Sequence, residues 1–282
     1  MHRGRPCGLT AHPARATPWA TSRISRTPRT QRTPRSPRTA GGSGRSSPTA
    51  SPVRRGTCVP GADHLAAAGH SVRLPLLPGH GTRWEDLETT SWQQWYQGVE
   101  TAFTELRDRC AAVFVCGFSM GGALALHLAA THPDGVAGVV LVNPSLGTYG
   151  LGPRLLGRAP VIARIKRTSH GIGGDVKKPG ARTSSYDLVP VRAAYQLTRL
   201  WRTVRGELPR VVAPTLLFRS RVDHVVDGRS ARLVRTGMRD AEFREEILGN
   251  SFHVALHDHD AERILTGSAD WIRAHGPDGL RG

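Results

Sequence analysis

The sequence predicts an α/β protein built on a mostly parallel sheet that helices flank. From residue 61 onward, several segments are apolar runs with little alternation, which is typical of strands covered on both faces. Between these runs lie segments with apolar residues at helical spacing, such as 91–109, where Trp92, Trp95 and Val99 mark one face. Residues 114–128, "FVCGFSMGGALALHL", read as a strand, a sharp glycine-rich turn and a helix.

The first 60 residues differ in composition from the rest of the chain. They hold 12 arginines, nine prolines and no Asp, Glu or Lys, whereas residues 61–282 hold the other 27 basic and all 22 acidic residues. Such a segment buries too little apolar surface to offset its ordering entropy, so we predict that residues 1–60 are disordered. Its composition is compatible with a basic arm, an organelle transit peptide or translation in a wrong reading frame.

Residues 61–146 alternate between helix and strand. The pattern predicts these elements in order: a short helix over 61–68, a strand near 71–76, a loop rich in Gly and Pro, a helix over 91–109, a strand over 112–116, a helix over 120–131 and a strand within 135–144. The aromatic residues of the 91–109 helix repeat at helical spacing, so we expect them in the core rather than on a binding surface.

An insertion interrupts this alternation at about 147–208. It is rich in Gly and Arg and holds a helical stretch near 191–205. Strands are expected again at 214–220 and 242–248, followed by a closing helix over 260–275. We therefore predict one folded domain over 61–282 with an insertion at about 147–208.

Ser119 is the candidate nucleophile. Residues 117–121, Gly-Phe-Ser-Met-Gly, match G-x-S-x-G, with an apolar strand before them and a helix after them. This context places the serine in a strained turn, with glycines where side chains would collide. The alternative is a glycine-rich strand–helix turn in an unrelated α/β protein.

A serine nucleophile needs a base, and the base needs an orienting carboxylate. With this motif the chain order is serine, acid, histidine. Asp223 follows the strand at 214–220 directly, and Asp227 competes with it four residues later. His253 falls in the loop between the strand at 242–248 and the last helix, so it can reach Ser119 across the edge of the sheet.

The segment "HDHD" at 257–260 could suggest a metal site, but no complete ligand set accompanies it. We interpret it as solvation of a loop or helix start, and we expect no metal and no cofactor. Four cysteines lack metal-like or disulfide-like spacing, and Cys116 reads as a buried reduced thiol. No run of about 18 apolar residues and no signal-peptide core occurs. We therefore predict a cytoplasmic protein without a membrane span, and no oligomeric state is predicted.

Residues 61–275 resemble the bacterial carboxylesterases and monoacylglycerol lipases of the α/β-hydrolase superfamily. Six segments carry the resemblance in order: "LPLLPGHGTRWEDL", "CGFSMGGALAL", "VNPSL", "GIGGDVKKPG", "FRSRVDHVV" and "NSFHVALHDHDA". It implies Ser119 as nucleophile, Asp223 as acid, His253 as base, and an insertion that forms a cap over an acyl pocket. The implied activity is hydrolysis of small-molecule carboxylic esters or monoacylglycerols through an acyl-enzyme. Most of the net charge of +17 lies in residues 1–60, so no nucleic acid is expected for the folded part.

The resemblance also implies an earlier central strand that ends in a His-Gly-Phe-Thr-Gly type motif. Its loop donates one backbone N–H to the oxyanion, and the residue after the nucleophile, Met120, donates the other. No such strand or motif precedes residue 61, and residues 79–81, Gly-His-Gly, match a different family segment. The second oxyanion donor therefore has no candidate, which leaves a catalytically impaired α/β-hydrolase remnant as the alternative function.

One cause would explain both the composition of the first segment and the lack of the strand. We hypothesise that residues 1 to about 60 come from an out-of-frame or mis-assigned start. Translation of the upstream DNA in the other two frames tests this, because the absence of an apolar strand followed by His-Gly would contradict it.

Overall fold

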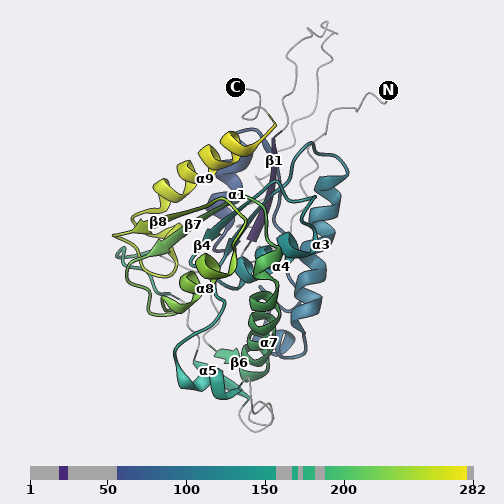
Figure 1. Cartoon of the computed structure of the whole chain (residues 1–282). Helices are drawn as coiled ribbons and strands as arrows, with labels where there is room; N and C mark the ends of the chain where they lie inside the picture. The colour runs from purple at the N-terminus through teal and green to yellow at the C-terminus, as the bar shows by residue number, and fades with distance from the viewer. Residues whose placement is uncertain (1–18, 25–55, 157–166, 171–173, 182–187, 278–282) are drawn as a thin grey trace, which may run out of the picture.

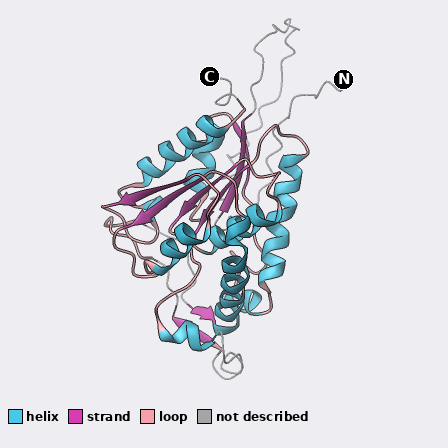
Figure 2. Ribbon diagram, viewed as in Figure 1, coloured by secondary structure: helices cyan, strands magenta, loops and turns pink. Residues whose placement is uncertain are grey.

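The computed structural model describes residues 19–24, 56–156, 167–170, 174–181 and 188–277. A six-stranded sheet forms the centre of the molecule, and helices cover both of its faces (Figures 1 and 2). Much of the described part of the insertion, α5, β6 and α7, extends away from the sheet at the lower end of Figure 1. Among the described residues, no helix combines the length and the apolar character that crossing a bilayer requires.

The sheet has the strand order β2-β1-β3-β4-β7-β8. Its last four strands run parallel to one another, while β1 is antiparallel to both β2 and β3. The predicted mostly parallel sheet flanked by helices is thus confirmed. The strand bounds are β1 Trp19–Ile24, β2 His70–Arg73, β3 Phe114–Phe118, β4 Gly138–Val142, β7 Thr215–Ser220 and β8 Phe243–Leu248.

The helices that were predicted are all present, and three unpredicted ones, α2, α5 and α8, accompany them in the part of the chain that the structure describes. Their bounds are α1 Val59–Ala67, α2 Trp84–Glu88, α3 Trp92–Arg107, α4 Met120–Thr131, α5 Leu151–Leu156, α7 Val191–Glu207, α8 Arg229–Gly237 and α9 Ala261–His275. Short 3₁₀ turns lie at Leu208–Arg210 and Ala255–His257, and β5 (Thr168–His170) pairs with β6 (Leu188–Pro190) in a small second sheet.

The two faces of the sheet carry separate cores. On one face, α3 buries Trp95, Val99 and Phe103 against α4, which is itself buried along most of its length. This confirms that the aromatic residues of α3 belong to the core. On the other face, α9 buries residues such as Ile264 and Trp271 against β4 and β7. Because both faces are covered, the central strands read as unbroken apolar runs.

β3 begins and ends two residues later than predicted. Gly117 and Phe118 continue the ladder by pairing with Leu141 and Val142 of β4, so the strand runs up to the residue before Ser119. The pentapeptide is therefore half strand and half helix, with the serine alone between them.

β1 is the main departure from the sequence prediction, which expected no strand before residue 61. Trp19–Ile24 fills the position between β2 and β3, and Thr21 pairs with Arg73 on one side and Val115 on the other. A strand there satisfies backbone groups that two neighbouring strands would otherwise leave unpaired. Trp, Thr and Ile in this hexapeptide also favour strand structure. The other residues before 56 lie outside the described part of the chain, so the predictions of disorder and of a missing oxyanion strand stay predictions.

Candidate active site

Ser119 occupies a strained turn between β3 and α4. Its backbone has φ 51° and ψ −120°, a combination that side-chain-bearing residues rarely adopt. The turn is possible only because its neighbours lack side chains. A Cβ on Gly117 would lie 2.5 Å from the carbonyl oxygen of Gly121, and a Cβ on Gly122 would lie 2.7 Å from Pro144.

Hydrogen bonds join Ser119 to His253 and His253 to Asp223. The distance from His253 Nε2 to Ser119 Oγ is 3.1 Å, and the distance from His253 Nδ1 to Asp223 Oδ2 is 2.8 Å. A carboxylate can only accept, so Nδ1–H donates to Asp223 and Nε2 is free to accept from the serine hydroxyl. The side chains of His253 and Asp223 are 5% and 6% exposed. The structure thus brings together the three residues that the sequence singled out.

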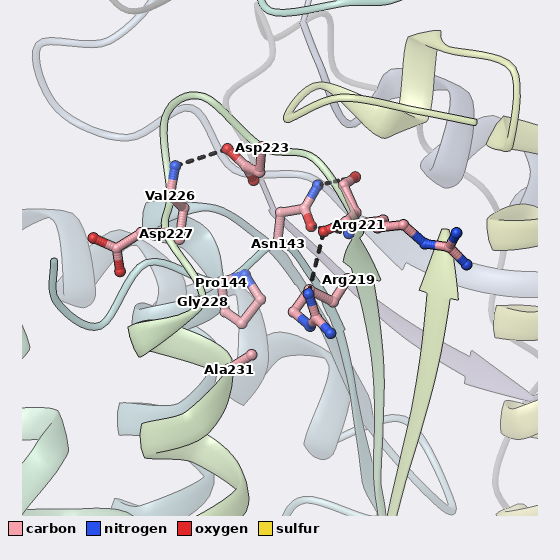
Figure 3. Close-up of a pocket in the computed structure, with 10 residues that line it drawn as sticks. Asn143, Pro144, Arg219, Arg221, Asp223, Val226, Asp227, Gly228 and Ala231 are labelled. Carbon is pink, nitrogen blue, oxygen red and sulfur yellow. Dashed lines mark hydrogen bonds between the residues drawn. The ribbon is translucent and has the colours of Figure 1, made fainter. Parts of the chain in front are cut away.

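Asp223 is fixed in place by its own loop, residues 221–228. Its Oδ1 accepts backbone N–H bonds from Val225 at 2.9 Å and from Val226 at 2.7 Å, the second of which is drawn in Figure 3. Oδ2 is thereby left for His253. Asp227, the competing acid, points elsewhere. Its carboxylate accepts from the Thr148 hydroxyl at 2.7 Å and from the backbone N–H groups of Tyr149 and Arg229. Asp227 therefore connects the start of the insertion to the start of α8.

The chain is 36% identical over 216 residues to a thermostable monoacylglycerol lipase from Bacillus sp. (strain H-257), covering 77% of this chain and 84% of that protein. The chain belongs to the esterase and lipase family of α/β-hydrolases. Residues 56–172 also match the family described as serine aminopeptidase, S33. Together, these two matches show that the chain is a hydrolase of the lipase and esterase type.

Solved structures agree with the family. A structure from work on LipS and LipT, two metagenome-derived lipolytic enzymes, superposes with a TM-score of 0.72 at 32% identity, over 77% of this chain and 87% of that one. A monoacylglycerol lipase from Paleococcus ferrophilus superposes with a TM-score of 0.62 at 19% identity, over 78% of this chain and 89% of that one, and supports the fold alone.

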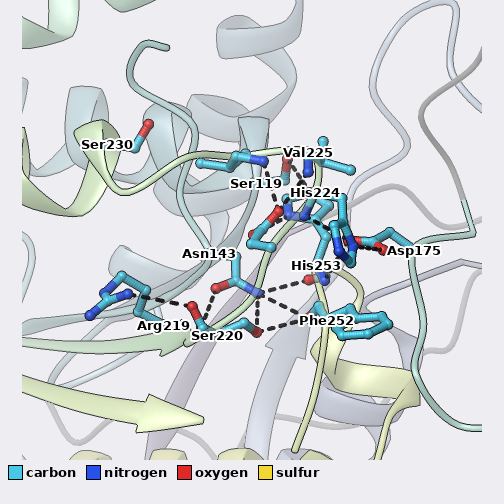
Figure 4. A network of polar contacts seen from close by, with 12 residues as sticks. Ser119, Asn143, Asp175, Arg219, Ser220, His224, Val225, Ser230, Phe252 and His253 are labelled. Atoms are coloured by element: carbon cyan, nitrogen blue, oxygen red, sulfur yellow. Dashed lines mark hydrogen bonds and ion pairs between the residues drawn. The ribbon is translucent and has the colours of Figure 1, made fainter. Parts of the chain in front are cut away.

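Asn143 is a site residue of this α/β-hydrolase that the sequence analysis missed. It follows β4 directly, is 2% exposed and has φ 43°. Its Nδ2 donates to Ser220 Oγ at 2.9 Å and to the backbone carbonyl of His253 at 2.8 Å, while its Oδ1 accepts from Ser220 N–H at 2.8 Å (Figure 4). An Asn-Pro pair after a buried strand was the available signal, because Asn tolerates positive φ better than most residues.

Asp258 holds the insertion against the loop that carries His253, residues 249–260. It accepts four backbone N–H bonds, from Lys177, Lys178, Phe252 and His259, at 2.7 to 3.0 Å. Burial acts to raise the pKa of Asp258, and these donors more than offset it, so the net pKa is lowered. The residue is 3% exposed, so it joins two loops rather than solvating one.

Residues of the "HDHD" segment, 257–260, form hydrogen bonds with separate partners. Asp260 accepts from Asn250 N–H and from the Ser251 hydroxyl, and the ring of His257 contacts the carbonyl of Thr57. Within the described ranges, no three His, Cys, Asp or Glu side chains are placed together to hold a metal ion.

Three other histidines have distinct surroundings. His80 lies edge-on to Trp95, and burial lowers its pKa to about 4. His127 hydrogen-bonds Glu207 of α7 at 2.6 Å. His224 follows Asp223 in the chain and lies beside the site, where its ring contacts Asp175 of the insertion at 2.7 Å. Its position next to Asp223 in the chain was the signal for this.

Two neighbours of Ser119, the start of α4 and strand β1, differ in whether they place a backbone N–H group where it could donate to an oxyanion. Met120 is the first residue of α4, where N–H groups have no intrahelical acceptor. On the other side, β1 is antiparallel, so its last residue, Ile24, pairs with His70 at the edge away from Ser119. The end of β1 nearer the site is Trp19, opposite Gly117. Within the described residues, the carboxyl end of β1 therefore lies at the edge of the sheet away from Ser119.

Proposed function

We propose that this chain hydrolyses carboxylic esters through an acyl-enzyme, with Ser119 as nucleophile, His253 as general base and Asp223 as the orienting acid. The observation that carries the proposal is the hydrogen-bonded series from Ser119 Oγ through His253 to Asp223, built on a serine with positive φ. A serine hydroxyl is a weak nucleophile until a base within hydrogen-bond reach can take its proton.

In the first half-reaction, Ser119 Oγ attacks the ester carbonyl carbon while His253 Nε2 takes the hydroxyl proton. The carbonyl oxygen becomes an oxyanion, to which the Met120 N–H donates. The intermediate collapses, the C–O bond to the alcohol breaks, and His253 returns the proton to the departing alkoxide. Asp223 holds the Nδ1–H and stabilises the imidazolium in between. In the second half-reaction, His253 activates water, which releases the carboxylic acid and restores the serine.

The proposed substrates are small-molecule carboxylic esters, with monoacylglycerols as the specific class. Relatives named monoacylglycerol lipase and carboxylesterase support this assignment. The insertion at about 147–208 would serve as a cap over the acyl chain. Its residues 174–181 lie against the loop that carries His253, which is where a cap next to the nucleophile must be anchored.

A second candidate is an impaired remnant of the same fold, and the direction of β1 favours it. If Met120 supplies the only oxyanion donor, turnover should fall about 10² to 10³-fold below that of a two-donor relative. Fold and serine geometry would be unchanged, so only rates separate the two candidates.

The test measures hydrolysis of p-nitrophenyl butyrate, p-nitrophenyl decanoate and 1-lauroylglycerol by the full chain. Ser119→Ala should remove at least about 10³-fold of the activity, and Thr101→Ala, which deletes an exposed hydroxyl on α3, should leave it unchanged. Equal rates for the wild type and Ser119→Ala would refute the hydrolase proposal. Serine-dependent turnover about 10² to 10³-fold below that of the Bacillus relative, assayed side by side, would favour the remnant.

A further inference from the structure

Asp175 links the insertion to both loops that supply the proposed catalytic acid and base. One carboxylate oxygen, Oδ2, accepts the backbone N–H of His224 at 3.1 Å and the backbone N–H of His253 at 3.1 Å. The other, Oδ1, contacts His224 Nδ1 at 2.7 Å, and the backbone carbonyl of Asp175 accepts from Val254 at 3.0 Å. Two segments that are far apart in the chain therefore meet at one side chain (Figure 4).

The backbone of His253 is held from both sides. Asp175 takes its N–H, and Asn143 Nδ2 donates to its carbonyl at 2.8 Å. Because His253 is 4% exposed, its ring has little freedom except through movement of this backbone. The 3.1 Å contact between Nε2 and Ser119 Oγ thus depends on partners that do not contact the nucleophile themselves.

Asp175 and Asp223 each pair with the ring of one histidine, Asp175 with His224 and Asp223 with His253. Asp223 accepts from His253 and is followed in the chain by His224, while Asp175 pairs with the His224 ring and with the His253 backbone. Burial acts to raise the pKa of Asp175, but hydrogen bonds from His224 and His253 more than offset it, so the pKa is lowered and the carboxylate is ionised. Ionised acceptors make the stronger hydrogen bonds.

We propose that Asp175 is a positioning residue for His253, so that the 174–178 segment of the insertion completes the catalytic site as well as covering it. This inference rests on the proposed function. Asp175 does not touch the reacting atoms. Its role is to fix the separation of the loop carrying Asp223 from the loop carrying His253.

The expected size of the effect follows from geometry. A displacement of about 1 Å at a catalytic group can cost about 10²-fold in rate. Asp175→Asn keeps the shape of the side chain and removes the charge. We expect kcat to fall about 10 to 10²-fold and KM to change less than about threefold, because the substitution changes only the bonds of residue 175 to His224 and His253.

His224→Asn is the matched variant. The His224 ring is 59% exposed, and its removal leaves the bond from Asp175 to the His253 backbone intact. This variant should keep at least a third of the wild-type kcat. Asp134→Asn, an exposed turn carboxylate between α4 and β4, controls for loss of one negative charge.

The experiment combines kcat and KM on p-nitrophenyl butyrate, thermal melting, and the proton NMR signal of the His253 Nδ1–H that donates to Asp223. Asp175→Asn should shift or broaden that signal at a temperature where the protein is folded, and His224→Asn should leave it sharp. The NMR readout does not need turnover, so it tests positioning even if Ser119→Ala shows that no serine-dependent hydrolysis occurs.

Two outcomes would overturn the proposal. One is a folded Asp175→Asn variant with wild-type kcat and an unchanged Nδ1–H signal. The other is a loss of kcat of about tenfold or more in His224→Asn. The contact that matters would then be the one from Asp175 to the His224 ring in the Asp223 loop, and not the one from Asp175 to the His253 backbone. The second outcome remains decisive if Asp175→Asn does not fold.

Discussion

The four strands β3, β4, β7 and β8 contribute to the site differently from β1, which lies in the same sheet. The first four are parallel, so their carboxyl ends meet at a single edge. At that edge each strand is followed by a polar residue of the site: Ser119 after β3, Asn143 after β4, Asp223 after β7 and His253 after β8. Strand β1 is antiparallel to its neighbours, and the residue at its carboxyl end lies at the other edge.

The difference shows that the site depends on strand direction more than on strand number. A strand in the position of β1 can satisfy backbone hydrogen bonds in either direction, yet only a parallel one has its carboxyl end at the edge where Ser119 lies. Changes in the four parallel strands should therefore affect catalysis directly, whereas changes in β1 should affect stability before they affect catalysis.

The largest expected effect concerns the acid in the parallel half. Asp223→Asn should lower kcat about 10⁴-fold, because an amide at this place no longer holds His253 in the tautomer that accepts from Ser119. Steady-state hydrolysis of p-nitrophenyl butyrate measures it.

Asp227→Asn is the matched variant, since Asp227 bonds Thr148, Tyr149 and Arg229 instead of the histidine. It should reduce kcat less than about tenfold. A larger loss in Asp227→Asn than in Asp223→Asn would reverse the assignment of the acid.

The next effect compares two glycines. Gly117→Ala should destabilise the fold by about 3 kcal/mol, because the new methyl group would meet the backbone of Gly121 and Gly122 at 2.5 to 2.7 Å. Gly61→Ala in α1 meets no atom within 4 Å and should stabilise by about 0.5 to 1 kcal/mol through helix propensity. Urea unfolding measures both, and equal stabilities would contradict the close approach at the turn.

The sequence predicted the parallel half well because its signals are local. Apolar runs, the glycine-rich turn at Ser119 and the positions of Asp223 and His253 after their strands are each legible within about fifteen residues. The sequence predicted Asp223 as the acid and Asp227 as its competitor. What separates the two is where Val225, Val226 and Thr148 place their donors, and the sequence does not show this.

The residues that hold His253 in place were not predictable in the same way. Asn143 and Asp175 reach it from 110 and 78 residues away in the chain, and no periodicity encodes such pairings. β1 was missed for a related reason. Its six residues do not alternate or form an apolar run, and only the unpaired edges of β2 and β3 give them a partner.

Thr21→Pro tests the contribution of β1. Thr21 lies in the middle of β1 with a strand on each side, and proline removes a ladder donor and fixes φ. We expect a loss of about 2 kcal/mol in unfolding free energy, measured in urea, with kcat of the remaining folded protein changed less than about threefold. Thr21→Val keeps the backbone N–H and should be neutral. Wild-type stability in Thr21→Pro would show that β1 does not pair in solution.

The smallest effect is a pH dependence at the contact between the insertion and the parallel half. The pKa of Asp258 is lowered on folding, so its stabilising contribution is present above the unfolded value of about 3.9 and is lost as the pH falls through the folded value. Asp258→Asn should therefore cost about 1.5 kcal/mol at pH 7, from weaker bonds to Lys177, Lys178 and Phe252, and less at pH 2.5, where more of the wild-type carboxyl is protonated. Urea unfolding at both pH values, with exposed Asp240→Asn as control, measures this. If the loss in unfolding free energy caused by Asp258→Asn is the same at pH 7 and at pH 2.5, the shape of the Asp258 side chain, and not its charge, anchors the insertion to the loop that carries His253.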